Sequence, residues 1–272
     1  KDAIVDQFKE KYDKRPSVSV SNPDILINIH IASNNHCTVS LDSSGESLHK
    51  RGYRTAQTQA PINEVLASGM LLLAKWKGKS NFIDPMCGSG TFLIEAALIA
   101  LNIPPGIFRK SFGFEKWKNF DQELFEEIYN DDSQEKEFTF KIYGADISAT
   151  AVNITEQNIA NAGLNKYIEV KRCSINELDI PKDKFLMVTN PPYGERLKDN
   201  DLSTLYENIG RLLKFKFAHN EAWIISSEEP LLSKIGLKPS RKIKLLNGDL
   251  DCLFCQYEIF DGKRNEYLRK KE

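Results

Sequence analysis

The chain has 272 residues, which allows one large domain or one domain with a smaller module. Hydrophobic residues make up 41% and charged residues 28%, so disorder over most of the length is excluded. With 37 basic and 38 acidic residues the net charge is −1, and binding of nucleic acid would have to rest on local basic patches. Five cysteines, an odd number spread along the chain, argue against a secreted disulfide framework and predict a reducing, cytoplasmic compartment. No apolar run approaches the roughly 18 residues of a membrane span, and no signal peptide is visible.

The first 60 residues predict a small α+β module. A helix over 1–11 is followed by two strands, 25–31 and 38–42, and then by a basic, turn-prone stretch over 49–54. One helix and two strands are a thin core for an independent domain. Because the chain also begins with Lys1 rather than Met, we expect this part to be the end of a module whose beginning is missing.

From Pro61 onward, strands and helices alternate as in an α/β protein with a parallel sheet. Residues 102–138 interrupt this alternation with a proline-containing loop, an aromatic and basic stretch and an acidic helical pattern. Asn247-Gly248 fits a type I′ turn and predicts a final hairpin. The predicted strands are 81–84, 139–145, 167–171, 185–189, 222–226, 241–246 and 252–260, and the predicted helices begin at Pro61 and cover 92–101, 149–162 and 202–217.

A glycine-containing loop, residues 84–91, joins the first of these strands to its helix. Gly88 and Gly90 allow close approach of a ligand to the backbone, and the following helix offers free N–H groups. Asp84 at the strand end suits a ligand with an ammonium group, and Asp146 at the next strand end suits ribose hydroxyls. The alternative is structural, with two glycines that make a tight turn and Asp84 as a helix cap.

A second motif, Asn190-Pro191-Pro192-Tyr193, follows an apolar strand, at the edge where open parallel sheets bind ligands. The prolines remove two donors, so the loop offers the Asn190 side-chain oxygen and the Pro191 carbonyl as acceptors for an exocyclic amine. Tyr193 suggests a stacking face for a flipped base. The alternative is a rigid turn with an exposed tyrosine.

Together these motifs resemble the class I S-adenosylmethionine-dependent methyltransferases that modify exocyclic amines. Three further segments resemble, more narrowly, the bacterial THUMP-containing RNA methylases that make N2-methylguanosine in 23S ribosomal RNA, a family whose members are often described as DNA N6-adenine methylases. These segments are His49–Arg54 with Ala60–Glu64, Phe112–Trp117, and Asn190–Tyr193 continued by Gly194-Glu195-Arg196.

The resemblance implies an α/β fold: a Rossmann-like domain with a seven-stranded mixed sheet, and the remnant of a THUMP RNA-binding domain before it. We expect the THUMP part over residues 1–50, a linker over 51–60, and the methyltransferase domain over 61–272 with its insertion at 102–138. It also implies S-adenosylmethionine as cofactor and RNA as partner, with neither a membrane nor a metal involved.

The site residues that follow are predictions. Asn190, Pro191, Pro192 and Tyr193 are expected to be catalytic. The cofactor is expected on Asp84, Pro85, Met86, Cys87, Gly88, Ser89, Gly90, Thr91, Asp146, Ile147, Cys173, Ser174 and Asn190. Cys173-Ser174 replaces the acidic residue that many relatives use to contact the cofactor adenine. RNA is expected on Lys50, Arg51, Arg54, Arg109, Lys238, Arg241 and Lys242, although a solvated basic face is the alternative for each stretch.

Cys252 and Cys255 lie three apart on a strand and point to opposite faces, so we interpret them as buried side chains rather than metal ligands. The leading hypothesis is an RNA guanine-N2 methyltransferase. A DNA adenine-N6 methyltransferase and a non-catalytic RNA-binding module are the alternatives.

Overall fold

The computed structural model describes residues 1–59, 61–194 and 199–260, with the side chains of 199 and 200 excepted. Ala60, Glu195 and Arg196, which belong to the quoted motifs, lie outside these ranges. The chain forms two compact units, which are described separately: Lys1–Ser47 with Lys110–Asn130, and Leu48–Arg109 with Asp131–Glu272. In the described ranges, no helix has the length and apolar character needed to cross a membrane.

The smaller unit contains one helix, one hairpin and the inserted segment. Its hairpin is antiparallel, with Leu26 opposite Asp42 and Ile31 opposite Cys37. The backbone N–H of Phe114 donates to the carbonyl of Ser43, which ties the insertion to the hairpin. The elements are α1 (Asp2–Tyr12), β1 (Leu26–Ile31), β2 (Cys37–Asp42), the 3-10 helix η1 (Gly113–Lys116) and α4 (Gln122–Tyr129).

The insertion is less helical than its acidic pattern predicts. Over 121–137 the structure has only the two-turn helix α4, capped by the Asp121 side chain, which accepts from the N–H of Leu124. Its aromatic residues pack on one another: the Phe112 and Phe114 rings stack at 5.2 Å, and Phe125 lies 5.7 Å from Phe114. These three rings are half-buried, so they form an aromatic cluster on the smaller unit rather than a buried core.

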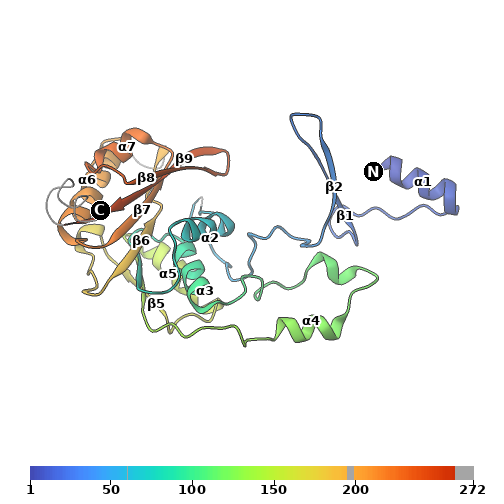
Figure 1. Ribbon diagram of the computed structural model, residues 1–272, viewed down its shortest axis with the longest axis horizontal. Coiled ribbons are helices and arrows are strands. Elements are labelled where there is room, and N and C mark those ends of the chain that lie inside the picture. The colour runs from blue at the N-terminus through green and yellow to red at the C-terminus, as the bar shows by residue number, and fades with distance from the viewer. Residues whose placement is uncertain (60, 195–198, 261–272) are drawn as a thin grey trace, which may run out of the picture. The chain divides into compact units, whose positions relative to one another are not determined.

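The larger unit confirms the predicted seven-stranded mixed sheet, with the order β5-β4-β3-β6-β7-β9-β8 (Figure 1). The first five strands in this order are parallel, and β9 is antiparallel to both of its neighbours. The hairpin predicted at Asn247-Gly248 joins β8 to β9. The strands are β3 (Asn81–Asp84), β4 (Ile142–Asp146), β5 (Ile168–Arg172), β6 (Phe185–Thr189), β7 (Glu221–Ser226), β8 (Arg241–Asn247) and β9 (Leu250–Glu258).

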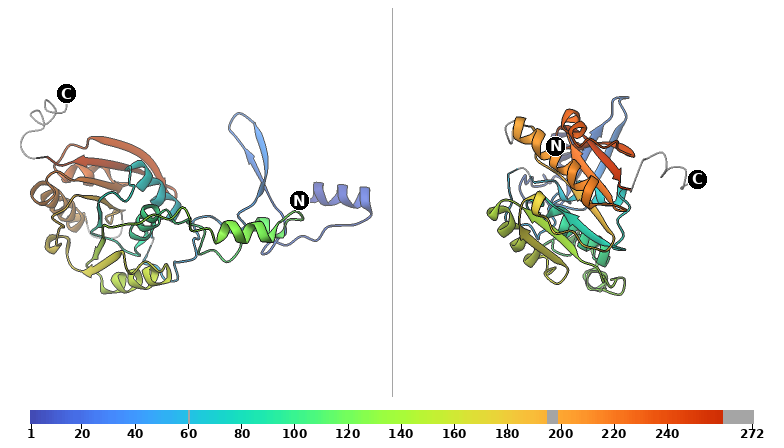
Figure 2. Two further views of the ribbon diagram at one scale, coloured as in Figure 1. Left: turned by 60° about the horizontal axis from the view of Figure 1, so that its bottom comes forward. Right: turned by 90° about the vertical axis from the view of Figure 1, so that its left-hand side faces the viewer.

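Helices cover both faces of this sheet, seen from two further directions in Figure 2. Alternate residues of each strand point to opposite faces, so Phe82 packs with α2, α3 and α5 while its neighbour Ile83 packs with α6 and α7. This two-sided burial explains the continuous apolar runs of the parallel strands. The helices are α2 (Glu64–Leu73), α3 (Thr91–Leu101), α5 (Ala149–Asn161), α6 (Asp199–Lys216) and α7 (Glu229–Lys234), with a 3-10 turn η2 (Ile175–Glu177).

The segment that enters the larger unit is packed into it from its first residues. Tyr53, expected in a linker, is 1% exposed and donates its hydroxyl to Glu95 of α3 at 3.0 Å. Helix α2 begins at Glu64 rather than at Pro61, because the Asn63 side chain accepts from the N–H groups of Val65 and Leu66 and so caps the helix there. The chain first passes from the smaller to the larger unit between Ser47 and Leu48.

Candidate active site

Three parallel strands end side by side at the candidate site. β3 lies between β4 and β6, so the residues that follow these strands gather at the carboxyl edge of the sheet. Thr189 at the end of β6 donates its hydroxyl to Asp84 Oδ1 at the end of β3, at 2.7 Å. The N–H of Gly88 donates to Asp146 Oδ2 at the end of β4, at 3.0 Å. The first hydrogen bond thus joins the ends of β6 and β3, and the second joins the glycine loop to the end of β4.

The glycine loop requires its glycines at defined places. Gly88 and Gly90 have φ of +56° and +79°, in the left-handed region. A Cβ on Gly90 would lie 2.7 Å from Cγ2 of Thr155, so a larger residue cannot fit without movement of α5. The Thr155 hydroxyl in turn donates to the carbonyl of Gly88 at 2.8 Å. The loop is therefore held in a fixed shape by α5.

Asp84 lies beneath the loop rather than in the open. It is 2% exposed, and its Oδ1 accepts from the Thr189 hydroxyl and from the N–H of Met86. Burial raises the pKa of Asp84 to about 7; the two hydrogen bonds oppose the shift, and the nearby Asp146 adds to it. The carboxyl group braces the loop, but it does not cap α3, whose N-cap residue is Gly90 and has no side-chain cap.

Asp146 also accepts hydrogen bonds from backbone N–H groups, but its side chain is partly exposed. Its Oδ2 accepts from Gly88, and its Oδ1 accepts from the N–H of Ser148 at 2.9 Å. A carboxylate oxygen can accept more than one hydrogen bond, so both oxygens retain acceptor capacity toward a ligand. Ser148 itself caps α5 by accepting from the N–H of Ala151.

The side-chain oxygen of Asn190 indicates that the site binds a hydrogen-bond donor. Its Oδ1 is buried and is one of the side-chain atoms without a hydrogen-bond partner in the described part of the chain. A buried acceptor that lacks a donor costs about 1–3 kcal/mol, so such an atom suggests a ligand that supplies the donor. The amide follows β6 directly and lies at the wall of a cleft.

A cleft of 670 Å³ opens beside these strand ends. Gly88, Asp146 and Asn190 line it together, so the two motifs that lie about 100 residues apart in the sequence do meet at one edge of the sheet. Of the other predicted cofactor and catalytic residues, Pro85, Met86, Ile147, Cys173, Ser174 and Pro192 also line it. Cys87, Ser89, Gly90 and Thr91 are buried behind it, and burial raises the pKa of the Cys87 thiol.

The structure does not place Tyr193 where a base could stack on it. Tyr193 is 3% exposed and packs in the core. Its hydroxyl accepts from Asn247 Nδ2 at 2.8 Å, and the Cys252 thiol lies 4.0 Å away. In this conformation the tyrosine ties the loop after β6 to the β8–β9 hairpin.

Three arginines expected to contact RNA are engaged inside the larger unit. Arg51, 8% exposed, pairs with Glu95, and Arg109, also 8% exposed, donates to the carbonyl of Lys50. Arg54 pairs with Glu64 at 3.2 Å and donates to the Thr91 hydroxyl. These interactions correct the interpretation of the three side chains as surface contacts. Lys50, Lys238 and Arg241 are exposed, and Lys242, also exposed, pairs with Glu229.

Several site residues were missed from the sequence. Thr58 and Gln59 line the cleft, and Thr58 donates its N–H to Ser89 Oγ at 2.8 Å. Asn158 donates to the carbonyls of Ala56 and Ser89 and so fastens this segment to the loop. A sequence signal existed, because Thr155 and Asn158 are polar residues three apart on the apolar face of a predicted helix. The lining is completed by Ser148, Ala151, Ile175, Asn176, Asp201, Thr204, Leu205 and Asn208.

Comparison with known proteins places this site in a family. A family model described as the RMKL-like methyltransferase domain matches residues 51–256. The chain belongs to the RMKL-like methyltransferase family. A second model, the THUMP domain, matches residues 1–42, so this methyltransferase domain follows a THUMP domain, as the sequence suggested. Among the described residues, no group of three His, Cys, Asp or Glu side chains is arranged to hold a metal ion.

Individual relatives agree with this membership. The chain is 38% identical to the ribosomal RNA large subunit methyltransferase K/L of Shewanella sp. (strain W3-18-1), covering 95% of the chain but 37% of that protein. It is also 38% identical to a candidate RNA methyltransferase of Synechocystis sp., and the match covers 96% of this chain and 68% of that protein. The chain therefore spans little over a third of the K/L protein.

Solved structures show the same fold. A possible methylase from Clostridium difficile 630 superposes with a TM-score of 0.84 at 36% identity, over 97% of this chain and 69% of that one. The methyltransferase candidate SMU.472, complexed with SAH, gives a TM-score of 0.83 at 33% identity, over 96% and 69%. The cofactor predicted from the sequence, S-adenosylmethionine, is confirmed as that of the family.

Proposed function

We propose that this RMKL-like domain is an S-adenosylmethionine-dependent RNA methyltransferase that methylates the exocyclic N2 amine of a guanine, in large-subunit ribosomal RNA. The buried Oδ1 of Asn190, which has no hydrogen-bond partner among the residues that the structure describes, carries this proposal, because it needs a donor such as an N–H of an amine. RNA is favoured by the THUMP match over residues 1–42 and by the name of the Shewanella relative.

The cleft fits the cofactor in size and in chemistry. Gly88 offers backbone that a ligand can approach, and Asp146 offers carboxylate oxygens for ribose hydroxyls. Cys173 and Ser174 line the part of the cleft that follows β5, where they are proposed to meet the adenine. When bound, S-adenosylmethionine would supply the methyl group and leave as S-adenosylhomocysteine, and the amine nitrogen would release one proton to water.

The protein contributes position and hydrogen-bond acceptors. Asn190 Oδ1 is proposed to accept a hydrogen bond from one N–H of the amine, and the Pro191 carbonyl is proposed to accept a hydrogen bond from the other, which orients the nitrogen toward the methyl group. Thr189 anchors the loop through Asp84, and Pro192 completes the wall. Because these groups are fixed before the substrate arrives, they need no reorganisation during transfer.

Asn190→Ala tests this assignment. We expect methyl transfer to RNA to fall by at least about 100-fold, as for removal of one preorganised hydrogen-bonding group at a reacting centre. Binding of S-adenosylmethionine, measured by calorimetry, should change by less than about threefold, since Asn190 is one of many residues at the cleft. Asn176→Ala, another cleft amide, is the matched control for general damage. Full turnover in the Asn190 variant would refute the role.

The product identifies the base. Mass spectrometry of nucleosides from RNA methylated by the chain should show N2-methylguanosine. A DNA adenine-N6 activity is the second candidate, because a structure described as a predicted N6-adenine-specific DNA methylase from Listeria monocytogenes is 32% identical with a TM-score of 0.81. Labelled cofactor offered with duplex DNA and with ribosomal RNA separates the two, and label in N6-methyladenine of DNA would replace the proposal.

A further inference from the structure

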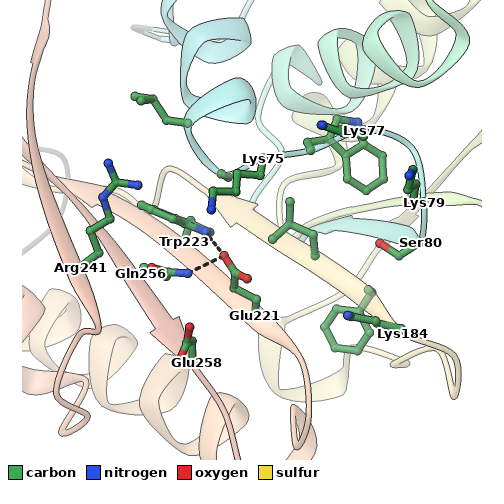
Figure 3. Close-up of a pocket in the computed structure, with 15 residues that line it drawn as sticks. Lys75, Lys77, Lys79, Ser80, Lys184, Glu221, Trp223, Arg241, Gln256 and Glu258 are labelled. Carbon is green, nitrogen blue, oxygen red and sulfur yellow. Dashed lines mark hydrogen bonds between the residues drawn. The ribbon is translucent and has the colours of Figure 1, made fainter. Parts of the chain in front are cut away.

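A second hollow lies at the opposite edge of the sheet from the cleft. It has a volume of 340 Å³ and lies at the amino ends of β3, β6 and β7, whereas the cleft lies at the carboxyl ends of the parallel strands (Figure 3). We call it the basic hollow, because five exposed cationic side chains from three parts of the chain line it: Lys75, Lys77, Lys79, Lys184 and Arg241.

The segment that carries three of these lysines is rigid. Trp76, 3% exposed, donates its indole N–H to the carbonyl of Ala96 in α3 at 2.8 Å. Gly78 has φ of +67°, and a Cβ there would lie 2.7 Å from the Cβ of Ala100. Lys75 itself has φ of +59°, a conformation that costs about 1 kcal/mol for a residue with a side chain. Trp76 and Gly78 thus fix the backbone to α3, while the lysines on either side remain exposed.

The cations of the hollow have no acidic partner among the described residues. The structure shows no ion pair within 4.0 Å for any of the five, although exposed lysines elsewhere pair, such as Lys141 with Glu169 at 3.0 Å. The carboxylate of Glu221 is instead held by neutral donors, the indole N–H of Trp223 and the amide of Gln256 (Figure 3). Five cations face two carboxylates, Glu221 and Glu258, in the lining.

We propose that the basic hollow binds the sugar–phosphate backbone of RNA. Lysines and an arginine suit phosphate oxygens, because ammonium and guanidinium groups are positively charged and have hydrogen-bond donors only. The chain as a whole has a net charge of −1, so this local excess of cations stands out against a balanced surface. The proposal rests on the proposed function for its choice of RNA, and it extends that function to a surface remote from the transfer site.

The test compares two triple variants of the full chain that carry the same change in charge. The first replaces three lysines of the hollow, as Lys77→Glu, Lys79→Glu and Lys184→Glu. The matched control replaces three exposed lysines outside both the hollow and the cleft, as Lys136→Glu, Lys166→Glu and Lys214→Glu. A Lys→Gln version of the first set separates loss of the cations from the added negative charge. Thermal unfolding verifies that each variant is folded.

The probe is a transcript of large-subunit ribosomal RNA, titrated over a range of salt concentrations. For the hollow variant we expect the Kd and the KM for RNA to rise about tenfold or more. The plot of the logarithm of the association constant against the logarithm of the salt concentration should become less steep by about 2, since each lost phosphate contact contributes roughly 0.7–0.9 to its slope. The kcat at saturating RNA and the affinity for S-adenosylmethionine should stay within about twofold, because no residue of the hollow lines the cleft.

Each outcome is decisive. An unchanged Kd and salt slope in the hollow variant would overturn the proposal, and so would an equal loss in the control set, which would indicate a general effect of charge. If the unaltered chain binds RNA through the hollow but transfers no methyl group to it, the proposed function is wrong, whereas the proposal of an RNA-binding hollow is supported. If the unaltered chain methylates RNA and the hollow variant has the same Kd and salt dependence as the unaltered chain, only the proposal of an RNA-binding hollow is refuted.

Discussion

At the scale of single residues, Asp84 shows that a site carboxylate can serve the fold. Its folded pKa of about 7 lies above the ordinary value of 3.8 because burial disfavours the charged form. Between these values the folded protein holds a proton that the unfolded chain releases. The free energy of unfolding should therefore fall as pH rises from about 4 to 7, by at most about 1.4 kcal/mol per pH unit from this group.

Asp84→Asn isolates this effect. Asparagine keeps an oxygen that can accept from Thr189 and Met86 but does not titrate. Urea unfolding at several pH values should give a flatter dependence for the variant than for the parent between pH 4 and 7. Glu95, whose pKa burial also raises, contributes equally to both proteins, so the difference between their slopes belongs to Asp84. Parallel slopes would contradict the buried, protonated state.

Single residues were also the scale at which prediction from sequence was weakest. Asn190 and Asp146 were expected at one edge of the sheet because both follow predicted strands, and both do line the cleft. Arg51 and Tyr193 were misread because sequence reports the chemistry of a side chain but not its exposure. Long-range partners, Glu95 and Asn247, hold them in the interior. Pairing across 44 and 54 residues leaves no local signal.

At the scale of elements, periodicity predicted most of the α/β alternation, because apolar runs and turn residues are local properties. The seven strands and the final hairpin agree with expectation, and their ends shift by a few residues. The insertion did not follow its pattern: over 121–137 acidic residues alone suggested a longer helix than α4. The basic hollow was not predicted, because Lys184 and Arg241 are far from Lys75 in the sequence and come close to it only when the strands pair in the observed order.

The contact between the glycine loop and α5 gives a test at this scale. Gly90→Ala should destabilise the larger unit by about 2 kcal/mol or more, since it adds both left-handed strain and a collision with Thr155. Gly163→Ala is the matched control, because Gly163 has φ of +67° but open space around it. Calorimetry should show a lower Tm for Gly90→Ala than for Gly163→Ala, and weaker binding of S-adenosylmethionine. Equal Tm values would show that the loop tolerates displacement.

At the scale of the whole molecule, we expect the larger unit to bind the cofactor and the smaller unit to contribute to RNA binding. Every residue that lines the cleft belongs to Leu48–Arg109 with Asp131–Glu272, whereas the THUMP match falls in the other unit. A chain that lacks residues 1–47, with 110–130 replaced by a flexible Gly-Ser linker, should therefore bind S-adenosylmethionine within about threefold of the parent, because its core and cleft are retained. Its KM for ribosomal RNA should rise by about tenfold or more, if the unit that carries the THUMP match contributes phosphate contacts as proposed. Calorimetry and steady-state methylation measure the two quantities separately. Loss of cofactor binding in a folded variant would show that the smaller unit takes part in forming the cleft.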